Sequence, residues 1–353
     1  MNEKMEIRAF LAEITAKRGD SGFEGPVAGR IFEEFQKYSK EVSIDKLGNV
    51  SAQMGEIGEE GKKGPTVLVC AHMDEIGLIV TGIEENGFLR FWQIGGVDPH
   101  ILPGGEVIVH GKEDLFGVIG HRPPHLSSSS PAAARLDELC IDIGLPKSKA
   151  EALVRVGDPI SFRAPLTRLL NERVAGKTFD DRACVTAMIV AMEELSRVKL
   201  RCRVRFVATV QEEVGVRGAK VAAQALEPDL AVAFDVCHAN MPGASPWETM
   251  PLGFVSLGKG PTLHPALFRR LEETAGALGI AIQADISSGR THTDADSAFL
   301  ANSGVPTALI SLPLAYMHTM VETIALRDVR EAGRLLAGFL KGVDEDWRDW
   351  LCV

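Results

Sequence analysis

The chain has 353 residues, of which 45% are hydrophobic and 24% charged, so it is long enough for two domains and typical of a globular protein. The formal net charge of -10 disfavours nucleic acids and anionic membranes as partners. The six cysteines include no Cys-x-x-Cys pair, and we interpret them as reduced thiols of a cytoplasmic protein. No apolar run approaches the roughly 20 residues that cross a bilayer, and the N-terminal residues lack the apolar core of a signal peptide.

The first half of the chain changes its texture near residue 77. Before that point, helical patterns at 4–17 and 25–39 precede an edge hairpin at 41–53 and a buried strand at 66–71. Short β-like runs separated by glycines then predict a compact β-rich module. These runs lie at 78–83, 88–94, 106–110, 115–119 and 156–162, with a polar loop at 127–131.

From about residue 170, helices and strands alternate. Helices are predicted at 182–195, 216–225, 265–278, 294–301 and 327–343, and strands at 202–210, 230–234, 280–285 and 307–312. The predicted fold class is α/β, with a mostly parallel, mixed sheet sandwiched by helices and an inserted β-rich domain. We therefore expect a discontinuous domain of residues 1–75 and 166–353, interrupted by a domain of residues 76–165.

The strand at 66–71 runs directly into a histidine and a carboxylate. His72 ends it, and Asp74 follows two residues later. Because strand side chains alternate between faces, His72 and Asp74 can point the same way. An imidazole beside a carboxylate suits a metal ligand that a neighbouring group orients.

Four further motifs end or follow buried strands, or begin a helix. They are Asp180-Asp181, Glu212-Glu213, Asp235 and His318. Since ligands of open α/β sheets gather outside the carboxyl ends of the strands, we expect these side chains to meet there.

The donors in these motifs are imidazoles and carboxylates, which suit zinc or cobalt and also manganese. If Asp180 bridges, each of two metal ions has three protein ligands and the pair can share a water molecule. Adjacent strand residues face opposite ways, so Glu213 can bind metal while Glu212 acts as general base. Each motif alone has an ordinary interpretation, such as a helix N-cap for Asp180-Asp181, but together they predict a dinuclear site.

The remaining histidines are not assigned to the metal site. His100, His110, His121 and His125 lie in the β-rich module and are interpreted as structural or surface residues. His238, His264 and His292 are candidates for the border of the cleft.

The motifs as a set resemble the glutamyl aminopeptidase family, also known as tetrahedral (TET) aminopeptidases, FrvX-like proteins or, under another label, endoglucanases. The stretches that carry the resemblance are Ala71–Gly77, Phe179–Arg182, Gln211–Gly215, Phe234-Asp235 and Tyr316–Thr319. The resemblance implies a zinc-peptidase-like fold with two divalent ions per subunit. The β-rich insertion would be a dimerisation domain, and dimers would assemble into a dodecamer that admits peptides.

The resemblance also implies a role for each residue. His72, Asp180 and Asp235 would bind one metal ion, and Asp180, Glu213 and His318 the other. Glu212 would be the general base and acid, and Asp74 would orient His72. The Asp180–Asp181 peptide bond would be cis.

The sequence departs from the family pattern at Ala315, where many members have arginine, and at 289–295, which contains Arg290 and His292. Neither change removes a ligand, but both bear on specificity. The expected function is removal of N-terminal residues from peptides. A glycoside hydrolase, a related metallo-deacylase or carboxypeptidase, and a scaffold without enzymatic activity are the alternatives. A glycosidase would need no metal.

Overall fold

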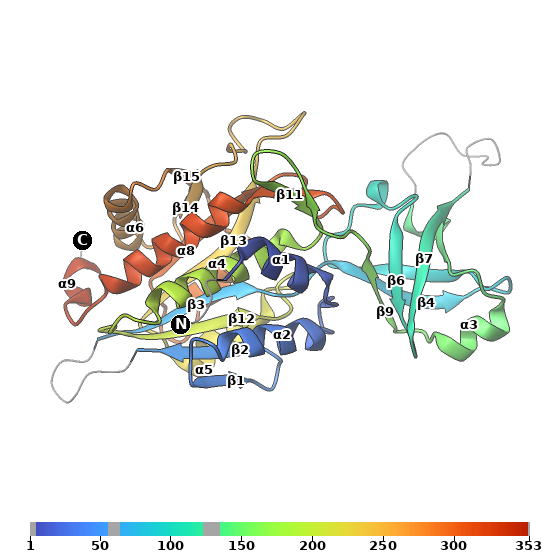
Figure 1. The fold of residues 1–353 in the computed structure, drawn as a ribbon, viewed down its shortest axis with the longest axis horizontal. Coiled ribbons are helices and arrows are strands. Elements are labelled where there is room, and N and C mark those ends of the chain that lie inside the picture. Colours follow the sequence, from blue (N-terminus) through green and yellow to red (C-terminus); the bar gives the residue numbers. More distant parts are fainter. Residues whose placement is uncertain (1–4, 56–63, 123–134, 352–353) are drawn as a thin grey trace.

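The structure is a computed structural model that describes residues 5–55, 64–122 and 135–351. It has two parts, a large α/β part and a smaller barrel at one end of it (Figure 1). The polar run at 127–131 and His125, both discussed above, lie outside the described residues.

The large part is built on an eight-stranded sheet. In order across the sheet, its strands are β1 (Glu41–Ile44), β2 (Val50–Met54), β12 (Arg203–Thr209), β3 (Thr66–His72), β13 (Leu230–His238), β16 (Thr307–Leu314), β14 (Val255–Lys259) and β15 (Ile282–Ile286). The four central strands β12, β3, β13 and β16 are parallel. Antiparallel pairs join β1 to β2, β2 to β12 and β14 to β16. The predicted mixed, mostly parallel sheet is therefore confirmed.

Helices cover both faces of the sheet, and alternate side chains of β3 pack against one helical layer and then the other. Val67 and Val69 belong to the larger core, whereas Leu68 and Cys70 belong to the core of the other face. The larger core includes α1 (Ile7–Ala16), α2 (Gly25–Phe35), α4 (Phe179–Leu195), α6 (Pro265–Leu278) and α8 (Leu326–Lys341), and the other includes α5 (Arg217–Leu226) and α7 (Asp294–Phe299). Because α4 is enclosed almost all round, its first turn is held rigidly against the ends of the strands.

The smaller part is a closed six-stranded barrel with its own hydrophobic core. Around the barrel the strands are β4 (Gly77–Ile83), β5 (Leu89–Ile94), β8 (Leu139–Asp142), β7 (Asp114–His121), β6 (Glu106–His110) and β9 (Pro159–Phe162). Closure pairs the edges that a short open sheet would expose. The chain enters through β4, five residues after His72, and returns to the large part after β9.

Smaller elements complete the fold. They are α3 (Lys147–Leu153), α9 (Trp347–Leu351), two 3-10 turns (Pro99–Ile101 and Leu136–Glu138) and a small sheet of β10 (Thr167–Arg168), β11 (Arg173–Gly176) and β17 (Glu322–Ala325). The sequence did not predict α3, α9, β8, β10, β11, β14 or β17, most of which are short. None of the helices within the described ranges is long and apolar enough to cross a membrane.

Candidate active site

The predicted motifs meet at the end of the sheet that faces the barrel (Figure 1). His72 is the last residue of β3, and Asp180 lies in the first turn of α4. Glu212 and Glu213 follow β12, and His318 follows β16. Parallel strands place their carboxyl ends together, so residues far apart in the sequence become neighbours here.

Asp180 lies between the two imidazoles. Its Oδ1 is 3.1 Å from Nε2 of His72, and its Oδ2 is 3.3 Å from Nε2 of His318. Glu213 also approaches His318, with Oε1 3.3 Å from Nε2. One carboxylate that reaches two imidazoles with separate oxygens can bridge two metal ions.

Both imidazoles are oriented by carbonyl oxygens. Nδ1 of His72 lies 3.2 Å from the carbonyl oxygen of Asp74, and Nδ1 of His318 lies 2.9 Å from that of Gly96. A carbonyl can only accept, so each Nδ1 donates and each Nε2 is left to face the carboxylates. This is the arrangement that a metal-binding histidine requires. Gly96 follows β5, so the barrel contributes to the position of His318.

The cluster has more buried carboxylates than cations. Oδ2 of Asp235 and Oδ1 of Asp181 are buried and have no hydrogen-bond partner within the described ranges. Burial raises the pKa of both carboxyls well above the ordinary range, and their mutual repulsion adds to the shift of Asp181. An unpartnered buried carboxylate oxygen is costly unless a cation reaches it. The donor set therefore fits divalent metal ions.

The neighbouring carboxylates strongly stabilise the protonated forms of His72 and His318. Burial acts to lower the pKa of His318, but hydrogen bonds to Asp180 and Glu213 outweigh it and raise the pKa to about 11. At His72 burial has the same opposing effect, and hydrogen bonds to Asp180 and Asp74 hold the pKa well above its usual range. The carboxylates thus create a site that favours positive charge.

Two groups of three donors converge, each with its ligand atoms within 4.8 Å of one another. One is His72, Asp180 and Glu213, and the other is His72, Asp181 and Asp235. Asp181 was not among the predicted ligands, and the predicted ligand His318 belongs to neither group. Oδ2 of Asp181 also accepts a hydrogen bond from the backbone N–H of His72. The Asp180–Asp181 peptide bond is cis, as the resemblance implied.

Asp74 has a broader task than the sequence suggested. Its Oδ1 lies 3.4 Å from Nδ1 of His72. The same carboxylate accepts hydrogen bonds from the backbone N–H groups of Glu212 and Glu213 and from the hydroxyl of Ser21. It therefore anchors the turn that carries the two glutamates.

The side chains of Glu212 and Glu213 point in different directions because of this turn, and not because they alternate along a strand. β12 ends at Thr209, and Gln211 has a φ of 56°. Glu213 then faces His318, while Oε2 of Glu212 lies 4.0 Å from Nε2 of His72. The expected separation is present, but the left-handed backbone at Gln211 produces it.

Asp235 lies within β13 and not after it, because that strand continues to His238. The extension pairs with β16, which reaches Leu314. The strand predicted at 230–234 therefore ends four residues too early.

Glu322 is an important residue that sequence reasoning missed. Its buried carboxylate accepts hydrogen bonds from the backbone N–H groups of Phe179, Asp180 and His318. It therefore joins two of the predicted motifs. Glu322 begins the short strand β17, and no motif in the neighbouring sequence indicated that it belongs to the site.

The three histidines proposed for the border of the cleft are outside both donor groups. His264 caps α6 by accepting from Ala266 N–H, and His238 ends β13. At the departures from the family pattern, Ala315 is buried and pairs with Thr323, whereas Arg290 is exposed. Their effect on specificity stays a prediction.

Comparison with known proteins assigns this arrangement to a class. The profile of the M42 glutamyl aminopeptidase family matches residues 48–335, and the chain belongs to that family. The lysyl aminopeptidase of Pyrococcus furiosus is 35% identical over 342 residues, which cover 94% of this chain and 96% of that protein.

Two solved structures have the same fold along nearly the whole chain. The aminopeptidase APDkam598 of Desulfurococcus kamchatkensis superimposes with a TM-score of 0.89 at 34% identity, covering 98% of this chain and 96% of that one. The TET1 peptidase of Pyrococcus horikoshii, which can assemble into a tetrahedron or a large octahedral shell, has a TM-score of 0.84 at 33% identity, with 96% and 100% covered.

Proposed function

We propose that the protein is an aminopeptidase that uses two divalent metal ions to remove N-terminal residues from peptides. The observation that carries this proposal is the buried excess of carboxylates around two imidazoles whose Nε2 atoms converge on Asp180. Zinc and cobalt are the preferred ions, and manganese is also compatible with these donors. The proposed ligands are His72, Asp180, Glu213, Asp235 and His318.

The same charge distribution favours an amino terminus over a carboxyl terminus. A peptide ammonium group is attracted by the carboxylates, whereas a terminal carboxylate would need a protein cation in addition to the metal ions. Among the described residues that line the pocket, Lys177 is the only permanent cation, and Glu75 pairs with it. We therefore prefer an aminopeptidase to a carboxypeptidase.

Glu212 is the proposed general base and acid. Two bound ions would supply Lewis acidity and acidify a water molecule at the site. Burial raises the pKa of Glu212 to about 10, and the charges of Asp235 and Asp294 contribute to the shift. Cations that neutralise this cluster would lower that pKa toward neutrality, where Glu212 can take a proton from water and deliver it to the leaving amine.

A substrate panel with metal removal and rescue tests this function. The protein is assayed on aminoacyl-arylamides, free peptides, N-acetylated peptides and β-glucan, before and after chelation and with zinc, cobalt or manganese added back. We expect cleavage of free peptides and arylamides only, loss of activity on chelation, and rescue by metal. Cleavage of N-acetylated peptides, or β-glucan hydrolysis that resists chelation, would reject the proposal in favour of its alternatives.

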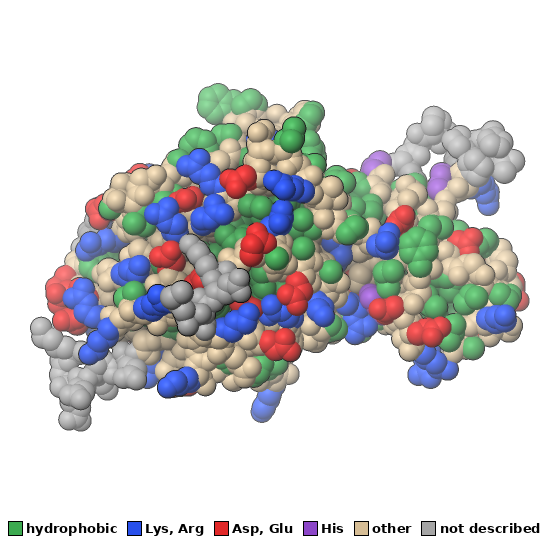
Figure 2. Space-filling model, viewed as in Figure 1, with side chains coloured by type: hydrophobic (Ala, Val, Ile, Leu, Met, Phe, Trp, Pro, Cys, Tyr) green, Lys and Arg blue, Asp and Glu red, His purple; other side chains and the backbone are tan. Residues whose placement is uncertain are grey.

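We infer further that the protein self-associates through the barrel, building dimers that assemble into a dodecamer. The barrel exposes large apolar side chains, including Phe116 (51% exposed) and Trp92 (54% exposed). Hydrophobic side chains are visible between charged ones on its outer surface (Figure 2). Apolar side chains in such numbers on a small barrel are typical of a buried interface.

Analytical ultracentrifugation tests this assembly. Phe116→Ser and Trp92→Ser together should reduce the particle to a smaller species, with the fold unchanged by circular dichroism. Ile44→Ser is the control, because Ile44 is similarly exposed (49%) but lies on β1 in the α/β part. An unchanged particle in the barrel variant would place the interface elsewhere.

A further inference from the structure

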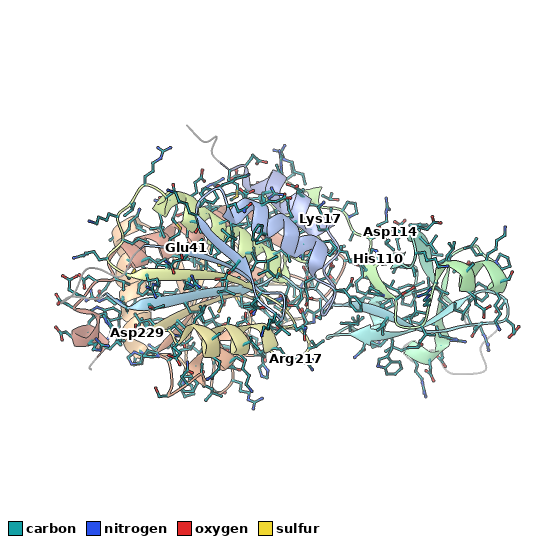
Figure 3. The ribbon with its side chains drawn as sticks, turned by 90° about the horizontal axis from the view of Figure 1, so that it is seen from below. Lys17, Glu41, His110, Asp114, Arg217 and Asp229 are labelled. Carbon is teal, nitrogen blue, oxygen red and sulfur yellow. The ribbon has the colours of Figure 1, made fainter. Side chains whose placement is uncertain are left out.

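A second cavity, of about 560 Å³, lies between the α/β part and the barrel. The end of α1 and the segment before α4 form one side, where Lys17, Arg18 and Lys177 lie. Strands β6, β7 and β9 with the residue after β9 form the other, which includes His110 and Arg163. Lys17 and His110 can be seen on the two sides of this junction in Figure 3.

The lining of this cavity is strongly cationic. Lys17, Arg18, Arg163 and Lys177 face it, and Asp114 is the one carboxylate among the described residues of its lining. Two of the cations already have partners outside the lining, since Arg163 pairs with Glu106 and Lys177 pairs with Glu75.

Lys17 and Arg18 are the two lining cations that have no ion-pair partner among the described residues. Within the part of the chain that the structure describes, neither side chain makes an ion pair or a hydrogen bond. Nε of Arg18 is buried and has no hydrogen-bond partner among the residues that the structure describes. A guanidinium and an ammonium that lack an ion-pair partner among the described residues are charge-assisted donors that an anion in the cavity can satisfy.

The polar groups on the barrel side are already occupied. Nδ1 of His110 lies 2.6 Å from Oδ1 of Asp114, and its Nε2 lies 2.9 Å from the hydroxyl of Ser161. That hydroxyl also contacts Oδ2 of Asp20, at 2.7 Å. The contacts from Asp114 through His110 to Ser161 resemble those of a hydrolytic triad. However, Ser161 is only 5% exposed, and its hydroxyl oxygen is enclosed by two hydrogen-bond partners. The three residues therefore tie the barrel to Asp20 and leave ligand binding to the cations.

We propose that this cavity binds a small oxyanion, a phosphate or carboxylate group, through Arg18 and Lys17. The guanidinium presents a planar fork that matches two oxygens of such a group, and the ammonium adds a point charge. The cavity is large enough for a small metabolite that carries the group.

The location places the oxyanion next to residues that also line the catalytic pocket. Lys177 and Phe162 line both this cavity and the pocket that contains Asp180 and His318. Lys177 also precedes Asp180 by three residues. An anion bound here would contact both parts of the protein directly behind the catalytic cluster, as expected of an effector site.

Isothermal titration calorimetry on the full-length, metal-loaded protein tests the site, with inorganic phosphate and succinate as separate probes at constant ionic strength. We expect millimolar or tighter binding of at least one probe. Lys17→Gln with Arg18→Gln should weaken it by at least about tenfold, because both charge-assisted contacts are lost. Lys149→Gln with Lys220→Gln is the control: both lysines are exposed and lie outside the cavity, and the charge change is the same.

Preferential binding of phosphate would assign the site to a phosphoryl group, and preferential binding of succinate would assign it to a carboxylate. Equal binding by the wild type and the cavity variant, or no binding of either probe, would overturn the proposal. If the double variant unfolds, Lys17→Gln alone serves, since Lys17 is exposed. The readout is binding and does not depend on peptidase activity, so the site stands or falls separately from the proposed function.

Discussion

Two clusters of buried charge lie on either side of the short segment from His72 to Glu75, and they are neutralised differently. In the junction cluster, the carboxylate of Glu75 pairs with Lys177 on one oxygen and with Arg182 on the other, at 3.0 Å to Arg182. In the catalytic cluster, Asp181 and Asp235 each have a buried carboxylate oxygen that no described residue contacts by a hydrogen bond.

The charges around Glu75 stabilise the fold, whereas those around Asp181 and Asp235 are arranged for binding cations. Protein cations balance Glu75, and Arg182 further bonds the carbonyl oxygens of Met73, Ile14 and Lys17, so this cluster fixes α1 and β3 against α4. Pairing both oxygens of Glu75 with protein cations avoids the cost of an unpaired buried charge. The catalytic cluster has no such balance from the described side chains, so we expect cations from solution to supply it.

The largest effect is expected from Glu212→Gln. The amide cannot accept the proton of the attacking water, so kcat/KM on an aminoacyl-arylamide should fall by about 10²- to 10⁴-fold. Metal content, measured by mass spectrometry, should stay the same, because Glu212 is not a proposed ligand. Glu33→Gln, an exposed glutamate of α2, is the control and should be fully active. Full activity in Glu212→Gln would remove it from the mechanism.

Glu75→Gln should destabilise the junction cluster most. The change leaves Lys177 and Arg182 buried without their counter-charge, and breaking such a pair costs about 3–5 kcal/mol. Urea unfolding measures the loss. An unfolding free energy within about 1 kcal/mol of the wild type would mean that Glu75 does not hold the junction.

Asp20→Asn should change how stability depends on pH. Burial, with the charge of Glu75, raises the pKa of Asp20 from 3.8 to about 7. A carboxyl with a raised pKa contributes stability below its ordinary pKa, and that contribution is lost as the pH rises through 7. Relative to Asp20→Asn, the wild type should lose up to about 4 kcal/mol between pH 4 and pH 8.

Urea unfolding at several pH values checks this difference, with Asp349→Asn, an exposed aspartate of α9, as the control. Parallel pH profiles for the wild type and Asp20→Asn would show that Asp20 titrates normally.

Asp235→Asn should change the free energy of unfolding by less than Glu75→Gln does, and in the opposite direction. In chelator-treated protein it removes a carboxyl whose ionisation burial opposes, so stability should rise, by about 1 kcal/mol. The hydrogen bond from Val236 N–H can persist because the amide keeps an oxygen. Metal retention should fall in the same variant. A loss of stability without metal would make Asp235 a structural residue.

Much of the catalytic cluster could be predicted because its residues sit where the hydrophobic pattern of a strand stops. His72 follows an apolar run, and Glu212 and His318 lie just beyond two others. Such signals are local and can be seen in one sequence.

The groups that support these residues could not be found in this way. Glu322 reaches Asp180 from 142 residues away, and Gly96 reaches His318 from 222 residues away. These contacts depend on how the barrel and the small sheet pack against the α/β part. Closure of the barrel is likewise tertiary, since the four-residue strand β8 completes it.

Metal content tests the central claim most directly. The protein is stripped with chelator, dialysed, titrated with zinc or cobalt, and assayed for bound metal and for arylamide hydrolysis in the same samples. The unbalanced catalytic cluster predicts about two ions per chain, with activity returning as they bind. Full activity in the stripped protein, with no metal bound, would contradict it.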